Sequence, residues 1–478
     1  MMKTEKQLRW SNIALIAFVA VWGLGNVVNN FALQGLSVVT SWILIMIIYF
    51  VPYTLIVGQL GSTFKEAEGG VSSWIRATST KRLAYYAAWT YWIVHIPYLA
   101  QKPQGILIAF SWLFRGNGNF VNNTPAIVVQ SICLVLFLFF LWIASLGLTT
   151  LKRIGSVAGT GMFIMSILFI ILAVSAPLMT KSTVQTPDML SFKSYLPKFD
   201  FAYFTTVSML VFAVGGSEKI SPYVNKTKNP GREFPLGMLV LAGMVAICAL
   251  LGSFAMGILF NAKDIPSDLM ANGAYYAFQR LGSFYHVGNL FMILYAIANV
   301  LAQVSALAFS IDAPLKILLG DADPEFIPKK LSKMNKKDVP VNGYIMTGIL
   351  VSILIIIPAL GIGNMNELYN WLLNLNSVVM PMRYLWVFLA YILLNQHLKE
   401  FKSDYMFLKN PMVGKLVGAW CFLFTAFACI LGMVPKTTSL ADNPSSWWFQ
   451  LSLNIATPII FVALGMILPM IARRHRTA

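Results

Sequence analysis

Two apolar stretches of the sequence are interrupted by glycines and polar residues where a membrane-spanning helix would be expected to continue. Residues 21–26 read Val-Trp-Gly-Leu-Gly-Asn, and residues 212–218 read Phe-Ala-Val-Gly-Gly-Ser-Glu. In hydrocarbon each unpaired backbone N–H or C=O group costs several kcal/mol, so non-helical backbone persists at membrane depth only where it lines an enclosed cavity or binds a polar ligand. Interruptions at corresponding positions of two halves of a chain are typical of the substrate sites of secondary transporters.

The first interruption places glycines and amides among apolar residues. Gly23 and Gly25 remove side chains that would shield the backbone, and Asn26, Asn29 and Asn30 follow. Backbone N–H groups released here, together with the positive end of the half-helix that follows, suit a carboxylate. The alternative is a glycine notch that lets a neighbouring helix pack closely, which is common in membrane proteins. The residues of this segment leave both interpretations open.

The second interruption has two consecutive glycines and is followed at once by two ionisable residues, Glu218 and Lys219. Ionisable groups within a membrane segment are costly and usually have a function. Carbonyl groups released at Phe212 and Ala213 could accept hydrogen bonds from an ammonium group, so the two interruptions together match the two ends of a zwitterionic amino acid. Glu218 is a candidate for gating, binding or proton transfer. Its alternative role is a structural ion pair with Lys219 or with a neighbouring helix.

Three further polar residues, Lys102, Arg383 and His95, lie inside apolar segments. Lys102 could attract an acidic side chain or replace a coupling cation, and it could instead extend its ammonium group to the membrane interface. Arg383 has the simpler interpretation of pairing with an acidic residue near the cytoplasmic side. His95 could change charge between about pH 5 and 8 if it lies near a cavity, and it could equally be a core histidine whose hydrogen bonds are satisfied.

The composition indicates an integral membrane protein. Of 478 residues 58% are hydrophobic and only 11% are charged, which is too little polar surface to cover a soluble globule of this size. The formal net charge of +17 follows from the side on which basic residues lie. If the amino terminus is cytoplasmic, roughly 25 Lys and Arg residues fall inside and roughly 7 outside. The charge therefore indicates topology, with both termini cytoplasmic, and no nucleic-acid partner is expected.

The cysteines and histidines predict no metal site and no cofactor. Cys133, Cys248, Cys421 and Cys429 fall in apolar segments without pairing or metal-ligand spacing, and the chain has only four histidines. The cysteines are expected to be inert packing residues. No catalytic constellation of paired acids, or of a nucleophile with its base, has workable spacing, so an enzyme is not expected.

The hydrophobic pattern predicts an all-α membrane protein with twelve transmembrane helices, taking about 20 apolar residues for each span. The predicted helices cover residues 11–34, 38–60, 83–113, 124–148, 154–179, 202–225, 235–260, 284–314, 341–361, 365–396, 413–434 and 446–471. The longer linkers, such as 61–82 and 261–282, are too short for an independent domain. Residues 1–478 are therefore expected to form a single polytopic domain.

Two sequence stretches resemble signatures of amino acid permeases in the amino acid, polyamine and organocation superfamily. The first is residues 212–218 followed by residues 227–235, which read Thr-Lys-Asn-Pro-Gly-Arg-Glu-Phe-Pro. The second runs from residues 59–62 through residues 68–74, and it is similar to the stretch that links helices 2 and 3 in the family. Within the superfamily the sequence looks closest to the glutamate:GABA antiporter family.

This resemblance implies a five-plus-five inverted-repeat fold with broken helices 1 and 6. The first repeat would cover residues 11–179, the second residues 202–396, and residues 413–471 would form peripheral helices 11 and 12. The implied substrate-binding residues are Gly23, Leu24, Gly25 and Asn26, with Phe212, Ala213, Val214, Gly215 and Gly216. The implied or candidate gating and proton-linked residues are Glu218, Tyr91, His95, Lys102, Tyr369 and Trp371.

The expected function is secondary active transport of amino acids across a bacterial cytoplasmic membrane by alternating access. Antiport is favoured, with an amino acid or its decarboxylated amine as counter-substrate, and a proton-coupled importer is the nearest alternative. A sensor or a channel on the same scaffold is the alternative from another class. The expected partners are a small amino acid and the lipid bilayer. The side chain of the substrate stays open, since Lys102 favours an acidic one and the aromatic residues around it favour an aromatic one.

Overall fold

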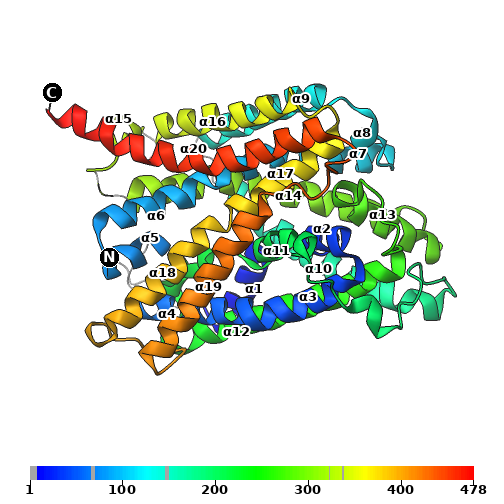
Figure 1. The fold of residues 1–478 in the computed structure, drawn as a ribbon, viewed down its shortest axis with the longest axis horizontal. Helices are drawn as coiled ribbons and strands as arrows, with labels where there is room; N and C mark the ends of the chain where they lie inside the picture. The colour runs from blue at the N-terminus through cyan, green and yellow to red at the C-terminus, as the bar shows by residue number, and fades with distance from the viewer. Residues whose placement is uncertain are drawn as a thin grey trace.

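The computed structural model describes residues 8–65, 70–145, 150–321, 323, 325–335 and 339–477. Within these ranges the chain is helical, and its only β-type pairings are two isolated bridges. Long helices pack side by side into a bundle, and the two ends of the chain are marked on the same side of the view (Figure 1). The prediction of an all-helical protein is confirmed.

Ten helical stretches in the described ranges are long and apolar enough to cross a membrane. They are Leu24–Thr63, Ala126–Ser145, Ala158–Met179, Phe201–Ser221, Pro230–Leu259, Leu290–Gly320, Val341–Ala359, Met365–Gln396, Pro411–Gly432 and Pro444–Arg473. Large apolar side chains such as Val135, Phe139 and Trp142 are exposed along one of them. Such surfaces are stable in lipid and unfavourable in water, so the structure is that of a multi-spanning membrane protein.

The helix predicted at residues 11–34 is divided in two. Helix α1 (Trp10–Val21) ends before Trp22 and Gly23, which have extended backbone, and α2 (Leu24–Gln34) begins directly after them. A turn at Gly35 (φ +58°) follows, and the chain continues through η1 (Gly35–Ser37), α3 (Val38–Ile45), the π-helical turn η2 (Met46–Phe50) and α4 (Val51–Thr63).

The helix predicted at residues 202–225 is also interrupted. Helix α11 (Phe201–Val214) ends at Gly215 and Gly216, and the chain resumes as a 3₁₀ helix, η4 (Ser217–Lys226). Gly216 has φ +114°, a backbone conformation that residues with a Cβ atom rarely adopt. Helix α12 (Pro230–Leu259) then begins with proline in its first turn, where the missing N–H group has no helical partner to lose.

The remaining elements complete the bundle. They are α5 (Val71–Thr78), α6 (Lys81–Ile93), α7 (His95–Arg115), α8 (Asn119–Asn123), α9 (Ala126–Ser145), α10 (Thr150–Met179), η3 (Phe192–Tyr195), α13 (Leu269–Phe284), α14 (Leu290–Asp321), α15 (Lys329–Ser332), α16 (Val341–Ala359), α17 (Met365–Val379), α18 (Met382–Gln396), η5 (Leu398–Glu400), α19 (Pro411–Gly432) and α20 (Pro444–Thr477). Helix α7 packs along α14 and α1 packs along α12.

Three further segments differ from the sequence prediction in how they are divided into helices and linkers. The helix predicted at 83–113 is divided at Val94 into α6 and α7, and the one predicted at 365–396 is divided near Pro381 into α17 and α18. The predicted linker 261–282 contains most of α13 (Leu269–Phe284). That segment mixes polar and apolar residues, so its sequence lacks a continuous apolar run, and its apolar face becomes buried only by packing on α2 and α14.

Candidate functional site

A cavity of about 700 Å³ lies beside both helix interruptions. Its lining comes from α1, α2, α7, α10, α11, η4, α13, α14, α17 and α18. Eight of the sequence-predicted site residues line it, namely Gly23, Leu24, Gly25, Asn26, Lys102, Phe212, Gly215 and Tyr369. Segments that are far apart in the sequence therefore meet at one cavity, as a ligand-binding site requires.

The Asn26 side chain joins the two interruptions. Its Nδ2 atom donates hydrogen bonds to the Ala213 carbonyl at 3.1 Å and to the Val21 carbonyl at 3.4 Å. Both carbonyls belong to helix ends, where backbone acceptors have no intrahelical partner. The Ala213 carbonyl, predicted to accept from a substrate ammonium group, is thus already occupied, and Ala213 itself does not line the cavity.

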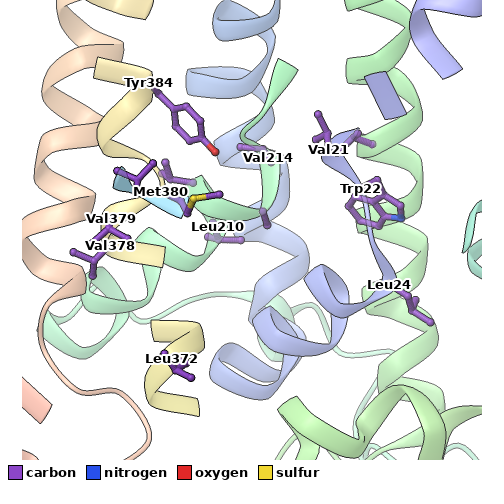
Figure 2. Packing of buried hydrophobic residues seen from close by; sticks show 14 of the residues in the cluster. Val21, Trp22, Leu24, Leu210, Val214, Leu372, Val378, Val379, Met380 and Tyr384 are labelled. Carbon is purple, nitrogen blue, oxygen red and sulfur yellow. The ribbon is translucent and has the colours of Figure 1, made fainter. Parts of the chain in front are cut away.

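The second interruption is packed tightly against α18. Figure 2 shows the Tyr384 ring with its hydroxyl directed toward the ribbon at Val214. A Cβ atom added at Gly215 would lie 1.9 Å from Tyr384 Oη. Any residue larger than glycine at Gly215 would therefore force Tyr384 or the backbone to move.

A buried ion pair follows the second interruption. Arg383 Nε lies 2.9 Å from Glu218 Oε1, and the two side chains are 2% and 0% exposed. Tyr53 of α4 donates a hydrogen bond to Glu218 Oε2, and Arg383 Nη2 donates to Tyr384 Oη at 3.3 Å. The predicted pairing of Arg383 with an acidic residue is found here, and the acid is Glu218. Removing either partner would leave an uncompensated buried charge.

His95 extends this network on the side of α7. Arg383 Nη1 lies 3.1 Å from His95 Nε2, and His95 Nδ1 lies 2.7 Å from the Tyr91 carbonyl. A guanidinium group can only donate, so Nε2 must be the acceptor and the proton of the neutral imidazole must be on Nδ1, donating to the Tyr91 carbonyl. His95 and Tyr91 are both buried outside the cavity lining. His95 is therefore a core histidine whose hydrogen bonds are satisfied, which is one of the two alternatives that the sequence left open.

The cavity lining carries cations but no carboxylate. Lys102 Nζ donates to Gln303 Oε1 at 2.9 Å and lies 4.2 Å from the centroid of the Tyr98 ring. Lys219 and Arg383 also line the cavity, whereas no Asp or Glu of the described chain does. Within the described ranges the Lys219 ammonium group has no hydrogen-bond partner. Since Glu218 balances Arg383, two basic side chains, Lys102 and Lys219, face the cavity without a described carboxylate partner.

Several predicted site residues lie outside the cavity lining. They are Ala213, Val214, Gly216, Glu218, Tyr91, His95 and Trp371. Lining residues that were not predicted as site residues include Lys219, Arg383, Gln101, Gln303, Asn299 and Tyr384. A charge inside an apolar segment was the available signal for the first two. The amides and Tyr384 had no such signal, because polar uncharged residues are common in membrane helices.

Residues 59–62 and 68–74, which resemble a permease signature, lie around the connection of α4 to α5. This stretch contacts the segment after the second interruption. A Cβ atom at Gly70 (φ +65°) would lie 2.6 Å from Ser221 Oγ in η4. Glu68 and Gly69 of the same stretch lie outside the described residues. The stretch therefore packs against the element that carries Glu218 and Lys219, which connects its sequence signature to the geometry of the cavity.

Comparison with known proteins agrees with this architecture. The family model for amino acid permeases matches residues 8–464. The chain is 64% identical over 472 residues to the aspartate/glutamate permease AcaP of Lactococcus lactis subsp. cremoris (strain MG1363), with 98% of this chain and 96% of that protein covered. It is 21% identical to the inner membrane transporter YjeM of Escherichia coli (strain K12), with 97% and 96% covered.

Glutamate/GABA antiporters are also related, at lower identity. The glutamate/gamma-aminobutyrate antiporter of Lactococcus lactis subsp. lactis (strain IL1403) is 26% identical, with 87% of this chain and 81% of that protein covered. The resemblance to the amino acid, polyamine and organocation superfamily is confirmed over nearly the whole sequence. The chain belongs to the amino acid permease family.

Proposed function

We propose that this permease is a secondary transporter of acidic amino acids, namely aspartate and glutamate, in the cytoplasmic membrane of a bacterium. The observation that carries the proposal is the charge of the cavity, which is lined by Lys102, Lys219 and Arg383 and by no described Asp or Glu. An acidic amino acid has two carboxylates and one ammonium group, so its net negative charge matches this lining. The 64% identity to an aspartate/glutamate permease supports the same substrate class.

The two ends of the substrate would be held by different parts of the cavity. The first N–H groups of α2 have no intrahelical partner and lie at the positive end of that helix, so we assign the α-carboxylate to Gly23, Leu24 and Gly25. The side-chain carboxylate would be attracted by Lys219 and Lys102. The Ala213 carbonyl accepts from Asn26 and the Phe212 carbonyl accepts from the Gly215 N–H group at 3.3 Å, so we assign the ammonium group to the Tyr369 hydroxyl, which lines the cavity.

Ten membrane-spanning stretches are compatible with the twelve predicted helices. One stretch, Leu24–Thr63, contains parts of the first two predicted helices joined by the turn at Gly35. The third predicted helix is not among the ten because it is divided at Val94 and carries Lys102 and several amides. Counting Leu24–Thr63 as two spans and adding the third predicted helix would give twelve. We therefore keep the proposal of twelve spans, with repeats at 11–179 and 202–396 and both termini in the cytoplasm.

With this topology the cavity extends toward the cytoplasm. Its lining continues from the interruptions to Leu15 and Ile16 of α1, to residues 158–163 of α10 and to Ser310 of α14. On the opposite side the apolar residues Met209, Met270 and Leu373 pack together.

We take exchange as the mode of coupling, as in the distant glutamate/GABA antiporters. The reason is that Glu218, the carboxylate next to the cavity, is held by Arg383 and Tyr53.

Uptake into proteoliposomes tests this proposal. Labelled aspartate, glutamate, leucine, tyrosine and arginine would be added to vesicles with and without internal unlabelled glutamate. We expect uptake of aspartate and glutamate alone, and only with counter-substrate inside. Uptake into empty vesicles under an imposed proton gradient would establish a proton-coupled importer instead. Equal uptake of leucine or arginine would overturn the proposed substrate class.

A matched pair of variants separates the role of the cavity charge from that of the fold. Lys219→Met removes a cation that faces the cavity and has no hydrogen-bond partner in the described chain. We expect it to raise the KM for glutamate at least tenfold while leaving the thermal stability unchanged. Gly243→Ala on α12 is the control, since Gly243 is exposed and its added Cβ would meet nothing within 4 Å.

A further inference from the structure

A second cavity, of about 500 Å³, lies next to the central one. Its lining includes Leu33 near the end of α2, Ser267 in the segment before α13, Glu367 and Asn370 of α17, and Lys436 beyond α19. In the proposed topology these segments face the outside of the cell. The central cavity extends the other way, so the two cavities are arranged along one path across the bundle.

A thin apolar layer separates the two cavities. Met209, Met270 and Leu373 form a small cluster of buried side chains, and Phe212 and Tyr369 pack against it. Met270 lines both cavities. Moving three side chains from α11, α13 and α17 would therefore join the outer cavity to the central one.

The outer cavity contains a lysine that makes no ion pair with a described carboxylate. Lys436 is half-buried, and its Nζ atom donates to Asn374 Oδ1 and, at 2.9 Å, to the Gly432 carbonyl. Among the described residues no carboxylate pairs with it. A carboxylate is the ligand group that such a cation would bind most favourably.

Acceptors for an ammonium group line the same cavity. Asn370 is only 4% exposed, and its Oδ1 atom has no hydrogen-bond partner. Asn366 Oδ1 is also unpaired, while its Nδ2 atom donates to the Ser267 carbonyl at 2.9 Å. Glu367 adds a carboxylate whose Oε2 atom has a single long contact, 3.5 Å from Ser446 Oγ. An unpaired buried acceptor is costly unless a donor reaches it.

We infer that the outer cavity is a second amino-acid-binding site, which holds the substrate before the layer of Met209, Met270 and Leu373 opens. The carboxylate of the amino acid pairs with Lys436, and its ammonium group binds Glu367 and Asn370. This inference rests on the proposed function and topology. It differs from them because it assigns recognition to a place outside the central cavity and predicts an effect on one face of the membrane only.

The test compares transport from the two faces. Oriented proteoliposomes would be prepared with wild type, Lys436→Gln and the control Lys198→Gln, which changes an exposed lysine in a loop. The KM for glutamate would be measured from the outer and the inner face. We expect Lys436→Gln to raise the outer KM about tenfold (about 1.4 kcal/mol) with the inner KM unchanged, and Lys198→Gln to change neither.

A second variant covers the case in which Lys436→Gln fails to fold. Ser267 is exposed and lines the outer cavity, so Ser267→Trp fills that space from a loop without disturbing the core, and it should raise the outer KM alone. An unchanged outer KM, or an equal change on both faces, would overturn the second site. If wild type itself does not transport acidic amino acids, the proposed function fails instead, so the two failures are distinguishable.

Discussion

The two helix interruptions look alike in the sequence but differ in what their glycines do. Cβ atoms added at Gly23 and Gly25 would meet nothing within 4 Å, because these residues face the cavity. A Cβ atom at Gly215 would collide with Tyr384, and Gly216 has φ +114°. Glycine at the first interruption leaves open space in the cavity, whereas glycine at the second lets the protein pack against itself. We therefore propose that the same residue type serves binding in one place and folding in the other.

The charges around the two interruptions follow the same division. Glu218, directly after the second, is paired with Arg383 and bonded to Tyr53. The first interruption carries no charge of its own and lines the same cavity as the half-buried Lys219. We therefore expect changes at the second interruption to reduce stability and changes at the first to reduce substrate affinity.

The largest effect should come from breaking the buried ion pair. Arg383→Met leaves Glu218 uncompensated, which costs about 3–5 kcal/mol. We expect little monodisperse protein in detergent size-exclusion chromatography. The double variant Arg383→Met/Glu218→Gln should regain much of the loss, because it leaves no lone charge. If the single variant were as stable as wild type, the ion pair would not be part of the folding role assigned to this region.

Gly215→Ala should have the next largest effect. The added methyl group would lie 1.9 Å from Tyr384 Oη, and overpacking of this kind costs about 3 kcal/mol. A thermal unfolding scan in detergent should show a lower midpoint than wild type. Gly243→Ala, which adds the same methyl group in open space, should not. Equal midpoints for the two variants would remove the distinction between the interruptions.

Gly25→Ala should affect function and spare the fold. Its methyl group meets no protein atom but occupies part of the cavity, so we expect the KM for glutamate to rise about tenfold, or about 1.4 kcal/mol. The unfolding midpoint should match that of Gly243→Ala. A lower midpoint with an unchanged KM would mean that the first interruption is structural, as the glycine-notch interpretation held.

The smallest effect should come from an ion pair outside the membrane, which is the reference for the buried one. Lys81 Nζ lies 3.0 Å from Asp323 Oδ2, and Lys81 is 60% exposed. The backbone N–H group of Glu325, and then Lys81, hold the pKa of Asp323 below its ordinary value. Asp323→Asn should cost less than about 1 kcal/mol at pH 7.

The difference in unfolding midpoint between wild type and Asp323→Asn should depend on pH with a definite sign. A carboxyl group with a lowered folded-state pKa stabilises the protein above its unfolded pKa of about 3.9, and the contribution is lost as the pH falls through the folded value. The midpoints of wild type and Asp323→Asn should therefore converge on acidification. A difference as large as that of Arg383→Met would contradict the idea that burial gives the ion pair at the second interruption its importance.

Local composition was enough to predict where the backbone leaves the helix. Glycines and amides within apolar runs identified residues 21–26 and 212–218, because backbone conformation depends mainly on the residues at that position and on whether they tolerate unpaired N–H and C=O groups. The same reasoning missed α13 (Leu269–Phe284), whose apolar face is completed by other helices.

By itself the sequence determined the helical membrane class, the two interruptions and the family. Only the tertiary structure decided that Arg383 pairs with Glu218, that Lys219 faces the cavity, and that His95 lies behind it. The physical reason is that these properties depend on how each helix is rotated about its axis. That rotation is determined by packing between segments more than a hundred residues apart, to which the local residue pattern contributes only weakly.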